Sequence, residues 1–194
     1  MSVKIKYSYN HKKITCYSFE IIKTVIIVFS LVSIIFTFFI RDANVVGNSM
    51  YETLHDSDKV FLTNFNYTPK SGDIVAINAE NMIEKRIIKR VIATEGQTIK
   101  LDYENDRIIV DGVVLDEPYI SDSTFAGNYG DYEIPEVVPE GKVFVMGDNR
   151  RVSLDSRRTE IGLIDVENVI GKAQFVAFPF SDFGYLYWFY NLIF

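Results

Sequence analysis

The residues from which hydrolytic sites are most often built are scarce in this chain. Its 194 residues include two histidines, His11 and His55, and one cysteine, Cys16. A single cysteine excludes an intramolecular disulfide and a cysteine-rich metal site. Two distant histidines leave little for a zinc site or a Ser-His-Asp triad. We therefore expect neither a metal nor a cofactor, and a serine nucleophile would need another base, such as lysine.

A lysine serves as a general base only when its amine is neutral. The ordinary lysine pKa of about 10.4 keeps the amine protonated at pH 7, whereas burial in apolar surroundings lowers that pKa. The sequence offers a serine on a turn signal, Ser49 after Gly47-Asn48, and a lysine among β-branched residues, Lys89 within Ile87–Ala93. Taken alone, each also reads as an ordinary residue, the serine in a loop and the lysine on a solvent-facing strand.

Taken with neighbouring segments, these two residues carry a family resemblance. The chain resembles the bacterial type I signal peptidases of peptidase family S26, in their Gram-positive-like form, over roughly residues 20–180. Four segments carry the resemblance, in the order in which the family has them. Ser49–Leu54 resembles S-M-x-P-T-L and Gly72–Val75 matches G-D-I-V. Lys89–Gly96 resembles K-R-V-I-G-x-P-G-D and Gly147–Arg157 matches G-D-N-R-x-x-S-x-D-S-R.

A second lysine competes with Lys89 for the role of base. Lys85 also begins a K-R-I-I stretch, and it lies four residues before Lys89, so both lysines share one face of a regular strand. The family has a glycine seven residues after its catalytic lysine. That position is Gly96 counted from Lys89 but Ile92 counted from Lys85, so we assign the role to Lys89.

The resemblance implies a role for each matched residue. Ser49 Oγ would attack the scissile carbonyl, and neutral Lys89 would take its proton and help to protonate the leaving amine. Ser153 would orient the Lys89 amine by a hydrogen bond. Asp155 and Arg157 would brace the wall of the site as an ion pair, although a purely structural role fits them equally well.

The oxyanion region and the substrate pocket are assigned on the same basis. The Ser49 backbone N–H is one expected oxyanion donor. Many relatives have a serine where this chain has Gly47, so the second donor is left open. Signal peptides end in small residues in an A-x-A pattern, which calls for shallow apolar subsites beside an open strand edge. The candidates to line those subsites are Val45, Val46, Met50 and Ile87. Glu52 departs from the family pattern, which has proline there.

An apolar segment predicts how the site is anchored. Residues 21–40 are almost wholly apolar, which is long enough for a helix to span a bilayer. The run is longer than a signal-peptide core and has no A-x-A site after it, so we favour a retained anchor over a cleaved signal peptide or a buried helix. Residues 1–40 carry a net charge of +4 and the remainder −10. The positive-inside rule then predicts a single-pass plasma-membrane protein with cytoplasmic residues 1–20, anchor 21–40 and an extracytoplasmic catalytic domain 41–194.

Short Val-, Ile- and Phe-rich runs separated by turn residues dominate the remainder of the chain. They predict a mainly β fold, an antiparallel catalytic domain of the signal-peptidase type behind one transmembrane helix. Ser121–Asp131 reads as a surface loop, and the aromatic tail Gly184–Phe194 either rests on lipid or packs on the core. The expected strands are Lys59–Phe65, Asp73–Ile77, Ile83–Thr94, Thr98–Asp102, Arg107–Val110, Val113–Leu115, Lys142–Met146 and Val169–Phe178.

The function expected from these features is a membrane-anchored serine endopeptidase that removes signal peptides at A-x-A-like sites. Its partners would be exported preproteins and the lipid bilayer, a functional monomer is expected, and the net charge of −6 argues against nucleic acid. The alternative is a non-catalytic accessory protein for pilus assembly on the same fold, which would need neither Ser49 nor Lys89. A self-cleaving repressor of the LexA type would need a DNA-binding domain that residues 1–40 do not supply.

Overall fold

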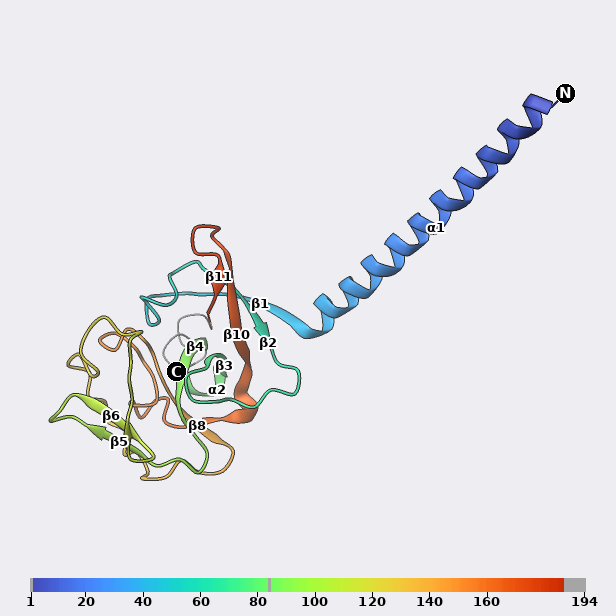
Figure 1. Cartoon of the computed structure of the whole chain (residues 1–194). Coiled ribbons are helices and arrows are strands. Elements are labelled where there is room, and N and C mark those ends of the chain that lie inside the picture. Colours follow the sequence, from blue (N-terminus) through green and yellow to red (C-terminus); the bar gives the residue numbers. More distant parts are fainter. Residues whose placement is uncertain (1, 84, 187–194) are drawn as a thin grey trace. The chain divides into compact units, whose positions relative to one another are not determined.

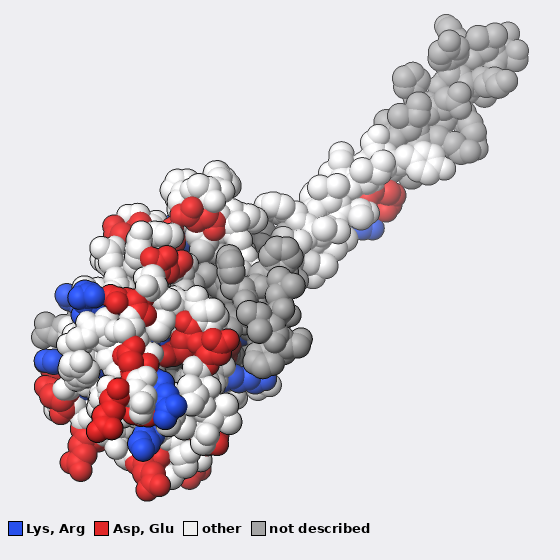
Figure 2. Space-filling model, turned by 60° about the vertical axis from the view of Figure 1, so that its left-hand side comes forward, with Lys and Arg blue, Asp and Glu red and all other residues white. Residues whose placement is uncertain are grey.

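The computed structural model describes residues 2–83 and 85–186, which fall into two units, Met1–Ile40 and Arg41–Phe194. The first unit is helix α1 (Ser2–Phe39). Its stretch Tyr17–Ile34 is long and apolar enough to cross a membrane, and none of it is buried against protein. The charged residues of this stretch are Glu20 and Lys23, whose side chains lie 3.7 Å apart. Figure 2 shows red and blue atoms side by side on the otherwise white part of the helix.

The helix differs from the expected anchor at both ends. It begins at Ser2 rather than near residue 21, because residues 2–20 contain no proline or glycine to interrupt it. Ile40, expected in the anchor, instead starts β1 (Ile40–Asn44). The division of the chain into cytoplasmic, membrane and extracytoplasmic parts stays a prediction.

The second unit is built on a large sheet whose strand order is β1-β2-β10-β3-β4-β8-β9, with β11 paired to β10 (Figure 1). The pairs joining β2 to β10, β10 to β3, β3 to β4, β4 to β8 and β8 to β9 are all antiparallel. The remaining strands of this sheet are β2 (Lys59–Thr63), β3 (Ile74–Ala79), β4 (Lys85–Thr94), β8 (Lys142–Met146), β9 (Ile164–Asp165), β10 (Val169–Phe178) and β11 (Gly184–Tyr185).

A smaller antiparallel sheet consists of β5 (Ile99–Asp102), β6 (Arg107–Val110) and β7 (Val113–Val114). Two short helices, α2 (Glu80–Ile83) and a 3-10 turn at Val166–Asn168, complete the described elements. The expected mainly β, antiparallel class is confirmed. The predicted strand Ile83–Thr94 begins two residues late, because Glu80–Ile83 turns as a helix between β3 and β4.

Three buried clusters form the core of the described residues. Each of them includes or contacts residues of β4, the strand that carries Lys89. The apolar run Val143–Met146 is buried throughout, as expected. Burying a side chain of this size contributes about 1.5–3 kcal/mol. The predicted surface loop Ser121–Asp131 is wrong in part, because Phe125 is 1% exposed and packs with Ile92 and Phe144.

The aromatic tail is described only at its start. Gly184 and Tyr185 pair with Val176 and Phe175 of β10, and Leu186 packs against the cluster that contains Met50 and Leu54. Residues 187–194, on which the lipid-contact alternative depends, lie outside the described residues.

Candidate active site

Ser49 lies on a tight turn that two buried side chains fix in the core. The backbone N–H groups of Thr53 and Leu54 both donate to the Met50 carbonyl, at 3.0 and 2.8 Å. The side chains of Met50 and Leu54 are buried, whereas Ser49 is partly exposed to solvent. The segment Ser49–Leu54, called the nucleophile turn below, therefore presents a hydroxyl from a backbone that the core holds in place.

Lys89 approaches that hydroxyl from strand β4. Its Nζ lies 2.6 Å from Ser49 Oγ, and the side chain is 3% exposed. Burial lowers the pKa of Lys89 from 10.5 to about 8, although the charges of Asp155 and Asp148 act in the opposite direction. Lys85, the competing lysine, is exposed at the start of the same strand. Near neutral pH, a useful fraction of the Lys89 amine is thus available as a base.

The loop after β8 packs directly on the backbone of the nucleophile turn. The Asn149 N–H donates to the Ser49 carbonyl at 3.0 Å. At Gly147, a Cβ atom would lie 2.4 Å from the Ser49 carbonyl oxygen and 2.3 Å from Ser153 Oγ. Only glycine allows this close approach, so the glycine of the G-D-N-R segment sets the position of Ser49.

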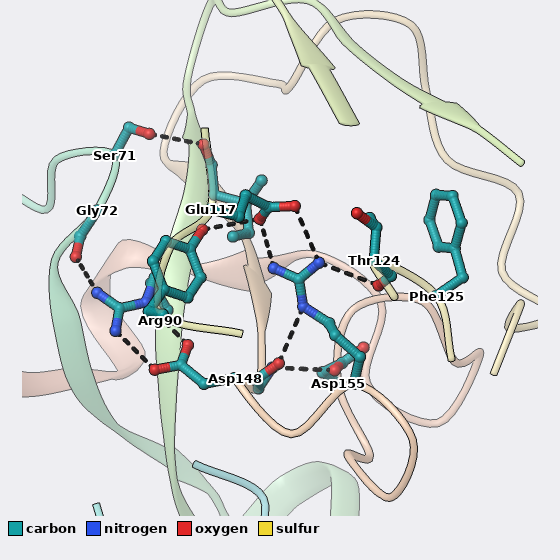
Figure 3. A network of polar contacts seen from close by, with 12 residues as sticks. Ser71, Gly72, Arg90, Glu117, Thr124, Phe125, Asp148 and Asp155 are labelled. Atoms are coloured by element: carbon teal, nitrogen blue, oxygen red, sulfur yellow. Dashed lines mark hydrogen bonds and ion pairs between the residues drawn. The ribbon is translucent and has the colours of Figure 1, made fainter. Parts of the chain in front are cut away.

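A buried polar network holds the nucleophile turn from the other direction. The Thr53 hydroxyl donates to Asp148 Oδ2 at 2.5 Å, and Arg90 donates to both oxygens of Asp148 at 2.8 and 2.6 Å. Arg90 also donates to the Gly72 carbonyl at 2.9 Å (Figure 3). Bidentate guanidinium–carboxylate pairs of this kind fix geometry strongly. They connect the four family segments to one another.

A second buried pair extends this network. Arg150 donates to both carboxylate oxygens of Glu117 and to the Thr124 carbonyl (Figure 3). The Tyr119 ring lies over the Arg90 guanidinium with 4.0 Å to the centroid, and its hydroxyl donates to Glu117. Burial raises the pKa of Tyr119, which keeps the phenol protonated as that donor.

Asp155 and Arg157 form a fully buried ion pair beside the dyad. Arg157 Nε and Nη2 donate to the two Asp155 oxygens at 2.8 and 2.9 Å, and the Gly147 N–H donates to Asp155 at 3.0 Å. Burial would raise the pKa of Asp155, but hydrogen bonds and charge from Arg157 outweigh it and lower that pKa. Asp155 therefore stays ionised near Lys89.

Ser153 lies beside Gly147 with its Oγ buried, and a hydrogen bond from the Ser153 side chain contributes to the lowered pKa of Asp155. The Asn128 amide donates to the Ser153 carbonyl at 3.0 Å and fixes its backbone. An orienting hydrogen bond from Ser153 to Lys89 stays a prediction.

The oxyanion region contains one engaged donor and one candidate donor. Gly47 has φ +85° and donates its N–H to Asp56 Oδ1 at 2.7 Å, so this group is already used. Among the described residues, no hydrogen bond engages the Ser49 N–H. Glu52 has φ +84°, a conformation closed to the proline found at this position in the family, because proline fixes φ near −65°.

The candidate pocket residues divide by exposure. Val45 and Met50 are core residues with 4% and 1% exposure, whereas Val46 is 88% exposed. Ile87 is half-buried and lies two residues before Lys89 on the same face of β4. Substrate contact with all four stays a prediction.

Sequence reasoning assigned no role to Thr53, Glu117 or Asn128. Thr53 lies within the S-M-x-x-T-L segment, which was a usable signal. Glu117 lies in the Glu117–Ile120 stretch, which is also typical of the family, but its contact with Arg150 could not be read from it. Asn128 contacts Ser153 from a distant loop, and nothing in its local sequence indicates this.

Comparisons with known proteins show the family to which the chain belongs. The family model described as signal peptidase, peptidase S26, matches residues 18–178. The chain is similar to signal peptidase I of Bacillus licheniformis, 38% identical over 84% of this chain and 90% of the relative. It is also similar to signal peptidase I T of Bacillus subtilis, 36% identical over 82% and 85%. A crystal structure of a signal peptidase I from Enterococcus faecalis matches 55% of this chain and 97% of that one, with 30% identity and a TM-score of 0.45.

Proposed function

The chain belongs to the signal peptidase family, peptidase S26, and from this premise we propose that it cuts signal peptides from exported preproteins with Ser49 as nucleophile and Lys89 as general base. As a family member it is a serine endopeptidase, a hydrolase. The observation that carries the assignment of residues is the 2.6 Å separation of Lys89 Nζ and Ser49 Oγ, together with the lowered pKa of Lys89.

The proposed reaction has two steps. Neutral Lys89 accepts the Ser49 proton as Oγ attacks the scissile carbonyl, and the resulting ammonium protonates the leaving amine. The Ser49 N–H stabilises the tetrahedral oxyanion. In the second step water, deprotonated by Lys89, releases the acyl chain from Ser49. Ser153 orients the amine, and the Asp155–Arg157 pair holds the wall behind it.

The substrate lies along a strand edge next to the dyad. In the pairing of β4, Lys85–Arg90 face β3, and β8 joins only from Arg90 onward. Among the described strands, the opposite edge of residues 85–89 is therefore open, and an extended peptide can add there by backbone hydrogen bonds. Ile87 and exposed Val46 then line shallow subsites that select small residues.

Helix α1 anchors the enzyme at the membrane in which its substrates are embedded. Its lysine-rich N-terminal side lies in the cytoplasm by the positive-inside rule, and residues 41–194 lie outside. The relatives named above are all called signal peptidase I, which does not favour a non-catalytic accessory role.

The test uses the full chain purified in detergent with a preprotein that carries an A-x-A site. Ser49→Ala and Lys89→Ala are each expected to abolish cleavage while leaving the fold intact. Lys100→Ala is the control, because it removes an exposed lysine from β5, outside the strand edge proposed for the substrate. Normal cleavage by a folded Ser49→Ala or Lys89→Ala protein would exclude the dyad. A bulky residue in place of the substrate's −1 alanine is expected to block cleavage.

A further inference from the structure

Away from the dyad, three side chains with metal-binding groups converge. His55 and Asp58 lie in the segment that leads from the nucleophile turn to β2, and Asp182 lies in the loop between β10 and β11. One donor atom from each residue lies within 4.8 Å of the others. We call this trio the His55 cluster.

The distances within the cluster suit a small cation. His55 Nδ1 lies 3.9 Å from Asp58 Oδ2 and 3.8 Å from Asp182 Oδ2. Tetrahedral zinc ligands lie about 3.4 Å apart, given metal–ligand bonds of about 2.0–2.2 Å. The histidine and Asp182 side chains are 47% and 37% exposed, so both can move inward. The two histidine distances must shorten by a few tenths of an ångström, and the two carboxylate ligand atoms, which lie within 4.8 Å of each other, must approach by at most about 1.4 Å.

A second, independent observation points to a missing ligand. Asp58 is 1% exposed, and among the described residues its Oδ1 has no hydrogen-bond partner. Its other oxygen, Oδ2, accepts the His55 backbone N–H at 2.8 Å and is the one that lies 3.9 Å from His55 Nδ1. Buried polar atoms are nearly always satisfied, so a carboxylate oxygen left unpaired at this position is the group that a cation would complete.

The contacts of the His55 imidazole direct its Nδ1 atom toward the two carboxylates. The Tyr51 ring packs edge-on against His55 at 5.2 Å between centroids, while Nδ1 faces both carboxylates. The partial exposure of the His55 and Asp182 side chains gives an ion access to the cluster from solvent.

We propose that the His55 cluster binds a divalent transition-metal ion through one imidazole nitrogen and two carboxylates, with Zn²⁺ as the ion that fits best. One nitrogen and two oxygens leave a fourth position for water, as zinc permits, whereas Mg²⁺ and Ca²⁺ prefer oxygen ligands alone. Two carboxylates balance the ionic charge. This site differs from the metal-free expectation drawn from residue counts, which did not consider a single histidine with one nearby and one distant aspartate.

The bound ion would connect the loop between β10 and β11 to the segment between the nucleophile turn and β2. The residues next to the cluster are bonded to the segment before the nucleophile: Val45 N–H donates to the Asp58 carbonyl at 2.7 Å, and Ser57 N–H to the Val45 carbonyl at 2.9 Å. The ion therefore has a structural role, and it takes no part in the chemistry of Ser49 and Lys89.

The experiment titrates Zn²⁺ into the chelator-treated full chain in detergent against a chromophoric zinc competitor, and follows thermal unfolding in parallel. One ion per chain is expected to bind and raise the unfolding temperature, because it binds the folded state alone. His55→Ala and Asp182→Asn should each weaken binding at least tenfold and remove the thermal shift. His11→Ala and Asp116→Asn, the other histidine and an exposed aspartate, are matched controls that should change neither. Asp58 is not substituted, because it is buried.

Three results would overturn the proposal: no saturable Zn²⁺ binding, equal affinity in the His55→Ala and Asp182→Asn proteins, or loss of binding in His11→Ala. Tighter binding of Mg²⁺ or Ca²⁺ than of Zn²⁺ would overturn the assigned class of ion. Preprotein cleavage by the metal-free protein is measured separately, so failure of the metal site and failure of the Ser49–Lys89 assignment are distinguishable.

Discussion

Replacing Lys89 by methionine is predicted to abolish cleavage and at the same time to stabilise the folded protein. The two effects have one cause. In the proposed mechanism the lysine acts as a base because burial disfavours its charged form, and the same penalty reduces the free energy of unfolding whenever the amine is protonated. Methionine has a similar length and no charge.

The structure sets the size of the effect. The pKa of Lys89 is about 8 when folded, against an ordinary value of 10.5. With about 1.4 kcal/mol for each pH unit between these values, the lysine costs folding about 3 kcal/mol at pH 7. Methionine also loses the hydrogen bond to Ser49, which is worth about 1 kcal/mol. The net gain is about 2 kcal/mol, or about 4–8 °C in the unfolding temperature of a unit of this size.

The pH dependence gives the prediction its sign. Between pH 8 and pH 10.5 the unfolded lysine holds a proton that the folded one has lost, so wild-type stability rises with pH relative to the variant. The advantage of Lys89→Met should therefore shrink above pH 8 and reverse to about −1 kcal/mol near pH 10.5, where only the lost hydrogen bond remains.

The assay is thermal unfolding of the full chain in detergent at several pH values, comparing each variant with wild type in the same buffer. Lys100→Met is the matched control, because it removes an exposed lysine from β5, and it should change stability little at any pH. If Lys89→Met were no more stable than wild type at pH 7, or if its advantage were constant up to pH 10.5, burial would not lower the pKa of Lys89 as proposed.

Three further outcomes are expected. The log of kcat/KM should fall by about one per pH unit below pH 8 as Lys89 protonates, and a flat acid limb would contradict a lysine base. Gly147→Ala should lower kcat about 100-fold because its Cβ would displace the Ser49 backbone. The control is Gly184→Ala, which should leave kcat unchanged because its φ is not positive and its Cβ would meet only the Asp182 carbonyl oxygen at 3.9 Å. Glu52→Pro, although it restores the family residue, should destabilise folding by more than about 1 kcal/mol because φ is +84°, as denaturant unfolding would measure.

Strands with strong local signals were predictable to the residue. Arg107–Val110, Lys142–Met146 and Val169–Phe178 have the predicted bounds, because β-branched residues fill them and turn residues bound them. β1 was missed, since its sequence I-R-D-A-N has no strand pattern and it forms only because an edge of the sheet accepts it.

The site divides in the same way. Ser49 and Lys89 could be found because their segments carry family motifs, and the structure places the two side chains in contact. The contacts that hold the nucleophile turn could not be found from the sequence. Thr53 and Asp148, for example, are 95 residues apart in sequence and meet only in the folded chain. Phe125 was likewise hidden, because its polar neighbours suggest a loop while its ring is drawn into the core.

The long separation between the nucleophile turn and its supports has a consequence for when activity first arises. The carbonyl of Ser49 is held by Asn149, Thr53 is held by Asp148, and β2 gains its partner β10 only at Lys172–Phe178. A nascent chain that has emerged as far as Lys89 already contains both dyad residues, yet it lacks every one of these contacts. Proteolytic competence is therefore expected only after the chain has been made as far as Phe178, where the last of these contacts becomes available.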